Sequence, residues 1–171
     1  DVVEADEISA IRKDFELAEA ELADDSKLLS LLRSYPAQLL PSFDKLIRNE
    51  NLVAAASAVL GSDLMVWSSG MFIKEAYSPK IVTWHQDLTY WGFNDNEKQV
   101  SAWIALTNAD EISGCMQMIP GSHKKGFFKH KSTNDENNVL SRGQTVNNVE
   151  IKKAVLCPLK PGEASLHHGL T

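Results

Sequence analysis

The chain has 171 residues, of which 43% are hydrophobic and 23% charged, a globular composition long enough for a core of its own. Its formal net charge is -6 and its pI is near 5.3, and its densest basic clusters are the short runs HKK and KHK, at residues 123–125 and 129–131. Phosphate backbones and anionic membrane surfaces are bound by clustered Lys and Arg. These properties therefore argue against nucleic acid or a membrane as the main partner.

The N-terminal third of the chain, residues 1–61, is predicted to be helical because its apolar residues recur at three- and four-residue spacing. The first stripe contains Ile8, Ile11, Phe15, Ala18 and Leu22. The sequence DDSK at residues 24–27 offers N-cap chemistry for a second helix, and Pro36 and Pro41 interrupt the stretch that follows. Residues 52–60, LVAAASAVL, predict a further helix that ends at a glycine, the residue favoured at helix C-termini.

From residue 62 onward, short runs rich in β-branched and aromatic residues alternate with turn sequences such as SSG, DEISG and KPGE. Residues 121–150, which we name the lid, contain STNDENN and little apolar pattern. The lid is predicted to be a long loop, of the kind that closes over the substrate of an enzyme. Strands are predicted at Leu64–Trp67, Met71–Lys74, Ile81–Asp87, Val100–Thr107, Cys115–Ile119, Ile151–Cys157 and Ala164–His168.

This order of helices first and short strands afterwards predicts a mainly β protein with N-terminal helices. The expected architecture is an antiparallel barrel or sandwich with the helices packed on one face, a fold that holds small ligands between its sheets. No second domain and no internal repeat is visible in the sequence. Residues 1–171 are therefore expected to form a single domain, with residues 62–171 as its β-core.

The two cysteines, Cys115 and Cys157, lack CxxC spacing and are predicted to be reduced rather than part of a disulfide framework. No apolar run approaches the roughly 18–20 residues of a membrane span. No signal peptide is visible either, although the chain begins at Asp1. A cytoplasmic location is the expectation.

The stretch VTWHQDLTYWGF, residues 82–93, places His85 and Asp87 two positions apart among residues that favour β-structure. In a strand, side chains i and i+2 point to the same face, so these two would project together while Gln86 points away. An imidazole and a carboxylate on one face are two ligands of a 2-His-1-carboxylate iron site, which leaves positions open for a cosubstrate and oxygen. The alternative is an ion pair at a strand end, partly exposed because burying it without a metal would cost desolvation free energy.

Two neighbouring stretches carry a resemblance to a known family. WHQDLTYWGF is followed by VSAWIALTNADEISGCMQMIPGSHKKG, which combines H-x-D, an aromatic-rich tail, a W-x-A-x-T strand, an acidic turn ending in Gly-Cys, and a P-G-S-H loop. In order and spacing these motifs resemble the phytanoyl-CoA dioxygenase family of non-haem iron, 2-oxoglutarate-dependent oxygenases. The resemblance spans residues 64–171, and residues 1–61 are similar to the family's N-terminal part.

The resemblance implies a double-stranded β-helix, the jelly roll of cupin-like proteins, with Fe(II) inside it and 2-oxoglutarate chelating the iron. His85 and Asp87 match the family's first two iron ligands. Trp103 matches a position that lines the 2-oxoglutarate pocket, and Met71 lies where the family also contacts this cosubstrate; for both, an ordinary core residue is the alternative. Related halogenases carry a small residue in place of the carboxylate, so Asp87 implies hydroxylation of a small organic substrate by O2, with release of succinate and CO2.

The third iron ligand of the family lies near the C-terminus, in a pattern like F-H-x-L-x-x-H-G-S whose second histidine binds iron. This chain ends with SLHHGLT, in which His168 matches the first histidine of that pattern. The resemblance therefore places the ligand two residues beyond Thr171 and the 2-oxoglutarate-binding arginine later still. The chain is accordingly expected to be a fragment, incomplete at both ends; the alternative is that His167 or His168 is itself the ligand.

Other residues near these motifs have weaker expectations. His123 in PGSH is expected to shape its loop and His130 to be solvated in the lid, while the aromatic residues Tyr90, Trp91 and Phe93 form either a substrate wall or core packing. Two rival functions stay open, a cupin-type metal enzyme that does not use 2-oxoglutarate and a non-catalytic barrel that binds a ligand. Neither the substrate nor the oligomeric state can be read from the sequence.

Overall fold

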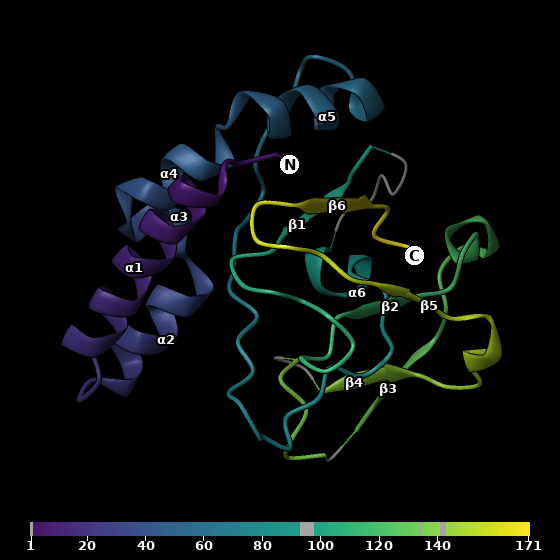
Figure 1. Ribbon diagram of the computed structural model, residues 1–171. Coiled ribbons are helices and arrows are strands. Elements are labelled where there is room, and N and C mark those ends of the chain that lie inside the picture. The colour runs from purple at the N-terminus through teal and green to yellow at the C-terminus, as the bar shows by residue number, and fades with distance from the viewer. Residues whose placement is uncertain (1, 93–97, 134, 141–142) are drawn as a thin grey trace. The chain divides into compact units, whose positions relative to one another are not determined.

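The computed structural model describes residues 2–92, 98–133, 135–140 and 143–171 (Figure 1). The chain divides into two compact units, each built from several segments. The helical unit comprises Asp1–Ile73, Ala102–Asn108 and Leu159–Ala164, and the second unit comprises Lys74–Ser101, Ala109–Pro158 and Ser165–Thr171. The expectation of one domain over residues 1–171 stays a prediction. Within the described ranges, no helix is long and apolar enough to cross a membrane.

The predicted N-terminal helices are confirmed. Figure 1 shows them as the purple and blue part of the ribbon, α1 (Ala5–Glu21), α2 (Ser26–Ser34), α3 (Pro36–Leu39), α4 (Pro41–Ile47) and α5 (Glu50–Leu60). Asp25 caps α2 by accepting hydrogen bonds from the backbone N–H groups of Lys27 and Leu28, at 3.0 and 2.9 Å. The two prolines that interrupt the helical pattern are the first residues of α3 and α4, where the missing N–H costs no hydrogen bond.

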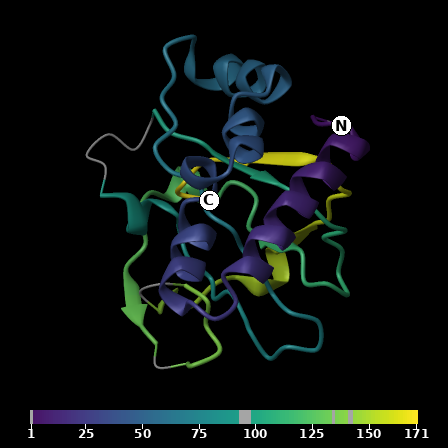
Figure 2. The same cartoon turned by 90° about the vertical axis from the view of Figure 1, so that its left-hand side faces the viewer.

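A hydrophobic core holds the helical unit together. The predicted stripe of α1 is buried at Ile8, Ile11 and Phe15, and the Phe15 and Phe43 rings lie 5.7 Å apart. Figure 2 shows α1 and α2 from the side of this helical layer, and an ion pair joins them, with 2.7 Å between Arg33 Nε and Glu19 Oε1. The other buried members of the core are Val3, Leu32, Ala37 and Leu46, with Ala18 and Leu22 packed against them.

Gly162, in the predicted KPGE turn, fastens the late segment of this unit to the N-terminus. Its carbonyl accepts hydrogen bonds from the N–H groups of Val2 and Val3, at 2.9 and 3.1 Å. Its φ is +87°, and a Cβ at this position would lie 2.2 Å from the carbonyl oxygen of Val3. Only glycine fits both this backbone conformation and this close approach.

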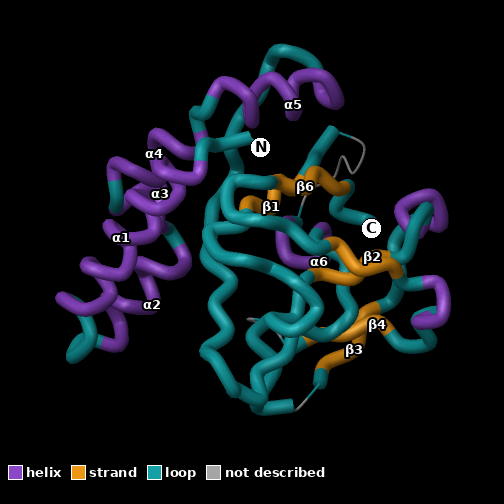
Figure 3. Tube along the Cα trace, viewed as in Figure 1, coloured by secondary structure: helices purple, strands orange, loops and turns teal. Residues whose placement is uncertain are grey.

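Short strands separated by long connections characterise the rest of the chain (Figure 3). The strands assigned in the described residues form three two-stranded sheets, of which β2–β5 and β3–β4 are antiparallel, with Gln117 opposite Leu156 and Lys131 opposite Thr145. Their bounds are β1 (Ser101–Ile104), β2 (Met116–Met118), β3 (His130–Ser132), β4 (Gln144–Val146), β5 (Val155–Cys157) and β6 (Ala164–His167). Four of the predicted strands are thus confirmed in shortened form, as β1, β2, β5 and β6.

Three predicted strands differ from the structure. In the described segments Leu64–Trp67 and Met71–Lys74 no residue is assigned to a strand. In the second of them, the Met71 N–H donates to the Arg33 carbonyl of helix α2 at 2.8 Å instead of to a strand. Ile81–Asp87 is reduced to one isolated bridge at Ile81. The Ile81 amide and carbonyl bond to residues 137 and 139, whereas the Trp84 carbonyl bonds to Val146, so no continuous ladder forms.

The lid has more regular structure than the predicted loop. It contains the 3-10 helix η1 (Ser122–Lys125) and the antiparallel pair β3–β4, and a second 3-10 helix, η2 (Ile151–Lys153), follows it. A short helix, α6 (Leu88–Trp91), begins directly after Asp87, where the sequence predicted a strand end. Residues 134 and 141–142 of the lid lie outside the described residues.

Candidate functional site

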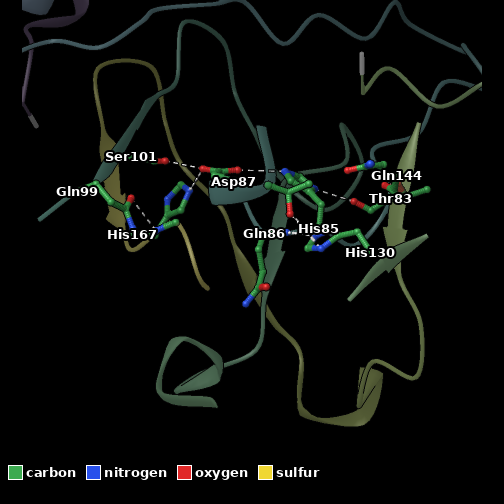
Figure 4. Close-up of polar contacts among 11 residues, drawn as sticks. Thr83, His85, Gln86, Asp87, Gln99, Ser101, His130, Gln144 and His167 are labelled. Carbon is green, nitrogen blue, oxygen red and sulfur yellow. Dashed lines mark hydrogen bonds and ion pairs between the residues drawn. The ribbon is translucent and has the colours of Figure 1, made fainter. Parts of the chain in front are cut away.

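The segment that carries His85 and Asp87 is held from both sides by hydrogen bonds to the lid. The Thr83 hydroxyl donates to the Gln144 carbonyl at 2.9 Å, and the Val146 N–H donates to the Trp84 carbonyl at 2.7 Å. Asn138 adds a side-chain bond of 3.0 Å to the Thr83 hydroxyl. The segment therefore has a fixed path although it forms no strand ladder of its own (Figure 4).

The imidazole of His85 is oriented by two contacts. Its Nδ1 lies 2.8 Å from the Thr83 carbonyl oxygen, and its Nε2 lies 3.1 Å from Asp87 Oδ1. Since a carbonyl oxygen can only accept, Nδ1 carries a proton and Nε2 is the nitrogen directed at the carboxylate. The side chains are 18% and 26% exposed. His85 and Asp87 thus lie together as the sequence predicts, even though the segment is not a strand.

Both oxygens of Asp87 are engaged, one by the neighbouring His85 and the other by residues from distant parts of the chain (Figure 4). Oδ1 faces His85, while Oδ2 accepts from the Ser101 hydroxyl and lies 3.2 Å from His167 Nε2. Burial opposes ionisation of Asp87, but the hydrogen bonds from His167, His85 and Ser101 outweigh it and hold its pKa well below the ordinary value. Burial also opposes a charge on His85, yet its contacts with Asp87 and Thr83 raise its pKa. The site is therefore a carboxylate that attracts positive charge.

This geometry fits two ligands of a metal ion. With Nδ1 protonated, a neutral His85 would direct the lone pair of Nε2 at an Asp87 oxygen that is also an acceptor. Either a second proton on the ring or a cation bound by both groups removes that conflict. A metal-bound histidine similarly donates its other N–H to a carbonyl, as His85 does to Thr83. Across the part of the chain that is described, no three His, Cys, Asp or Glu side chains are grouped as ligands of one ion.

The two C-terminal histidines occupy different surroundings. His167, at the end of β6, directs Nε2 at Asp87 and has a buried Nδ1 with no hydrogen-bond partner among the described residues. His168 instead accepts at Nδ1 from the Leu170 N–H, at 3.1 Å, and its ring centroid lies 5.8 Å from that of His123. Of the two alternatives for a third ligand, His167 is the one that contacts Asp87.

Gln86, which lies between the two site residues, points away from them and is 2% exposed. Its amide nitrogen donates to the carbonyls of Gly126 and Leu170, at 3.0 and 2.7 Å, and its amide oxygen accepts from the Phe128 N–H at 2.7 Å. One buried side chain thus joins the H-x-D segment to the lid and to the end of the chain. Sequence reasoning placed it on the opposite face but did not assign it these partners.

His130 was expected to be solvated, and the structure corrects this. Its Nε2 accepts from the Gln86 N–H at 2.9 Å, and its Nδ1 lies 2.9 Å from the Phe128 carbonyl. Burial lowers its pKa, and the nearby His85 acts in the same direction against the Phe128 carbonyl. His130 is therefore a neutral ring that holds the lid strand β3 against the H-x-D backbone. No local motif marks it, because Gln86, the partner that ties it to the H-x-D segment, lies 44 residues away in sequence.

The other predicted site residues lie elsewhere. Trp103, on β1, and Met71 belong to the helical unit; Trp103 is half-buried, and Met71 packs against the helical core. Their role at a cosubstrate site stays a prediction. Tyr90, on α6, places its ring edge-on to His85 with 5.9 Å between centroids, and Trp91 is the last residue of that helix. Phe93, the third aromatic residue of the proposed wall, lies outside the described residues.

A cavity of about 130 Å³ opens beside His85 within the second unit. Apolar side chains of Trp84, Met118 and Phe128 contribute to its wall, and Lys125 and Glu150 add charged groups. Typical sites for drug-sized ligands measure about 300–1,000 Å³, so this cavity accommodates a small molecule or one part of a larger one.

Comparisons with known proteins agree with this picture. The family model described as phytanoyl-CoA dioxygenase (PhyH) matches residues 1–171. The ectoine dioxygenase of Streptomyces coelicolor is 36% identical over 85 residues, which cover 48% of this chain and 28% of that protein. A "Probable alpha-ketoglutarate-dependent hypophosphite dioxygenase" of Stutzerimonas stutzeri is 28% identical over 149 residues, covering 85% of this chain and 50% of that protein.

The fold has a close counterpart among solved structures. The non-heme monooxygenase ThoJ, in its apo form, superposes with a TM-score of 0.83 at 25% sequence identity, over 97% of this chain and 61% of that one. In all three comparisons the match leaves more than a third of the other protein uncovered.

Proposed function

The chain belongs to the phytanoyl-CoA dioxygenase family, and on this premise we propose that the protein is an Fe(II)- and 2-oxoglutarate-dependent dioxygenase that hydroxylates a small organic substrate. The observation that carries the proposal is the His85–Asp87 pair. An imidazole Nε2 and a carboxylate oxygen meet at 3.1 Å, with the other imidazole nitrogen bonded to a backbone carbonyl. Histidine and carboxylate are the ligand types of the 2-His-1-carboxylate iron sites of oxygenases.

Each residue of the site has a proposed part. His85 and Asp87 would hold the iron, and among the residues of this chain His167, which contacts Asp87, is the candidate for a third ligand. Thr83 and Ser101 orient these groups through their hydrogen bonds. Trp103 and Met71 are proposed to contact 2-oxoglutarate, and the proposed fold is a jelly roll.

Iron with 2-oxoglutarate supplies the oxidising chemistry, in which 2-oxoglutarate and O2 yield succinate and CO2 while the substrate gains a hydroxyl group. The chain's own residues bind and orient the reactants and exclude water. Asp87 favours hydroxylation over halogenation of the substrate, because its carboxylate would occupy the ligand position that a halide needs. Relatives that are named as dioxygenases and as alpha-ketoglutarate-dependent support this assignment.

The test measures metal binding and turnover in the full-length protein. Titrating Fe(II) without oxygen should show that Asp87→Ala binds the metal more than about 100-fold more weakly than the parent, a larger loss than removal of an outer-shell partner causes. With 2-oxoglutarate, O2 and candidate substrates, only the parent should form succinate. Asp44→Ala, which removes an exposed carboxylate of α4 paired with Arg48, is the matched control and should leave both measurements unchanged. Equal metal affinity in Asp87→Ala and the parent, together with no succinate from any substrate, would refute the proposal.

A further inference from the structure

The cavity beside His85 is lined by apolar and by charged side chains, and this combination carries information on the substrate. Trp84, Met118 and Phe128 are half-buried lining residues, whereas Lys125 and Glu150, which we name the rim, are about half exposed. The two rim residues come from η1 and from the residue before η2, which lie on the same side of the second unit (Figure 1). A ligand that fills the cavity would thus meet His85 and apolar side chains as well as the ionic groups of the rim.

The rim is more positive than the protein as a whole. The chain has a net charge of -6, yet the two 3-10 helices that flank the cavity carry Lys124, Lys125, Lys152 and Lys153. The carboxylate among them is Glu150, whose Oε2 lies 3.0 Å from Lys125 Nζ and whose Oε1 lies 2.7 Å from Lys153 Nζ. The single carboxylate of Glu150 is therefore paired with two lysines, Lys125 and Lys153, and this group of three side chains keeps a net positive charge.

This arrangement allows an anion to enter without leaving Glu150 unpaired. If a ligand carboxylate or phosphate bonded to Lys125, Glu150 would keep Lys153 as its partner. Both lysines are more than half exposed, so the exchange moves only flexible, solvated side chains. When the cavity is empty, the Glu150 carboxylate would thus occupy the position at Lys125 that the anionic group of the ligand takes when it binds.

Ser122 adds a polar group to the same wall. It lines the cavity, is 8% exposed, and its hydroxyl has no hydrogen-bond partner among the described residues. A buried hydroxyl without a partner is unfavourable. A ligand oxygen beside Lys125, three residues further along η1, would give it one.

From these contacts we propose that the cavity binds a small amphipathic anion, with its apolar part beside His85 and its carboxylate or phosphate at Lys125. This inference rests on the proposed function, because it makes the anion the substrate that is presented to the metal. It assigns Lys125 as the residue that selects the charge of the substrate and Glu150 as the group the substrate replaces.

The test is binding of simple probes to the metal-free, full-length protein, so that it does not depend on catalysis. Hexanoate, hexanol and hexylammonium have the same alkyl chain with a negative, neutral and positive head group. Calorimetric titration should show tightest binding for hexanoate, and added salt should weaken it because the rim is exposed. Lys125→Gln should weaken hexanoate binding about fivefold, the size expected for a partly exposed charge contact.

Two further variants decide whether the contact is the one described. Glu150→Gln removes the competitor of the ligand and should tighten hexanoate binding about two- to threefold. Lys152→Gln, at another exposed lysine of η2 that does not line the cavity, is the matched control and should weaken hexanoate binding much less than Lys125→Gln does. Thermal unfolding of each variant confirms that these surface changes leave the fold intact.

The contrary outcomes are clear. Tighter binding of hexylammonium than of hexanoate, with loss of that preference in Glu150→Gln, would show that the cavity selects cations. Hexanoate binding that neither Lys125→Gln nor Glu150→Gln alters would place the anion elsewhere, at the 2-oxoglutarate site for example. Either result would refute this inference without affecting the measurements of Fe(II) binding and succinate formation. Failure of Fe(II) binding or of succinate formation would refute the proposed function without changing the hexanoate result.

Discussion

The side chain of Gln86 offers the sharpest test of how the site is held. Replacing it by methionine, which has a similar length and no amide, removes both donors and the acceptor. The Leu170 carbonyl, bonded at 2.7 Å in a buried position, would lose its partner, as would the half-buried Gly126 carbonyl and Phe128 N–H. The backbone N–H of Gln86 would still donate to His130, so the segment stays attached while its side-chain contacts are lost.

The expected cost follows from the burial of each group. A buried polar group without a partner costs about 1–3 kcal/mol, whereas losing a bond that water can replace costs about 0.5–1.5 kcal/mol. The apolar methionine recovers part of this by its own burial. We expect Gln86→Met to lower the free energy of unfolding by about 3 kcal/mol, with the largest share from the Leu170 carbonyl.

Urea unfolding of the metal-free protein measures this loss. With a urea m-value of about 1–3 kcal/mol/M, the midpoint should fall by about 1–3 M. Gln38→Met, at an exposed position of α3, is the matched control and should change the free energy by less than about 0.5 kcal/mol. Gln86→Glu should destabilise the protein at neutral pH because the new carboxylate faces two carbonyl oxygens, and should recover stability as the pH falls and the carboxylate is protonated. A loss in Gln86→Met no larger than in Gln38→Met would refute this account of the network.

Three other predictions follow from the same contacts. The contact with Asp87 raises the pKa of His85, so a metal ion must displace a proton from this ring. Calorimetric titration should therefore show a metal affinity that rises with pH above about 6.5, and binding heats that depend on the buffer. A metal affinity independent of pH would contradict the contact. Because the pKa of His130 is lowered in the folded state, its contribution to stability is complete above the unfolded pKa of about 6.5 and is lost as the pH falls below that value. In His130→Gln this loss should be absent, so the difference between the urea midpoints of variant and parent should change with pH. A difference that stays constant with pH would show that the ring is not held neutral. Ile8→Ala, at a position 1% exposed, should cost about 2–5 kcal/mol in urea unfolding, and a cost below 1 kcal/mol would mean that α1 is not packed as described.

The predictions from sequence succeeded where local pattern decides the structure. The spacing of Ile8, Ile11 and Phe15 predicted α1, and Asp25 predicted the start of α2, because helices depend on contacts within a few residues. The prediction that His85 and Asp87 share a face also held. Their contact, with 3.1 Å between His85 Nε2 and Asp87 Oδ1, forms without a strand ladder, although the backbone of Asp87 is helical rather than extended.

The parts that could not be predicted depend on contacts between distant segments. The strand pair β3–β4 and the position of His130 are set by bonds to Gln86, Thr83 and Trp84, which lie forty to sixty residues away. Alternation placed Gln86 only on the face away from His85 and Asp87. That this face is buried, so that the side chain needs hydrogen-bond partners, is seen only in the structure.

The hydrogen bonds of Asp87 and of Gln86 together explain why a charged site can lie in a largely buried place. Asp87 accepts hydrogen bonds from Ser101 on β1 and His167 on β6, and these bonds favour its ionised form. Gln86, one residue away on the opposite face, collects carbonyls and an N–H from the lid and the chain end. Within its own segment the Asp87 carboxylate contacts His85, and the remaining side-chain partners of both residues come from other parts of the chain. The arrangement of the His85–Asp87 pair therefore depends on the lid and on the C-terminal segment, which also supply parts of the cavity wall.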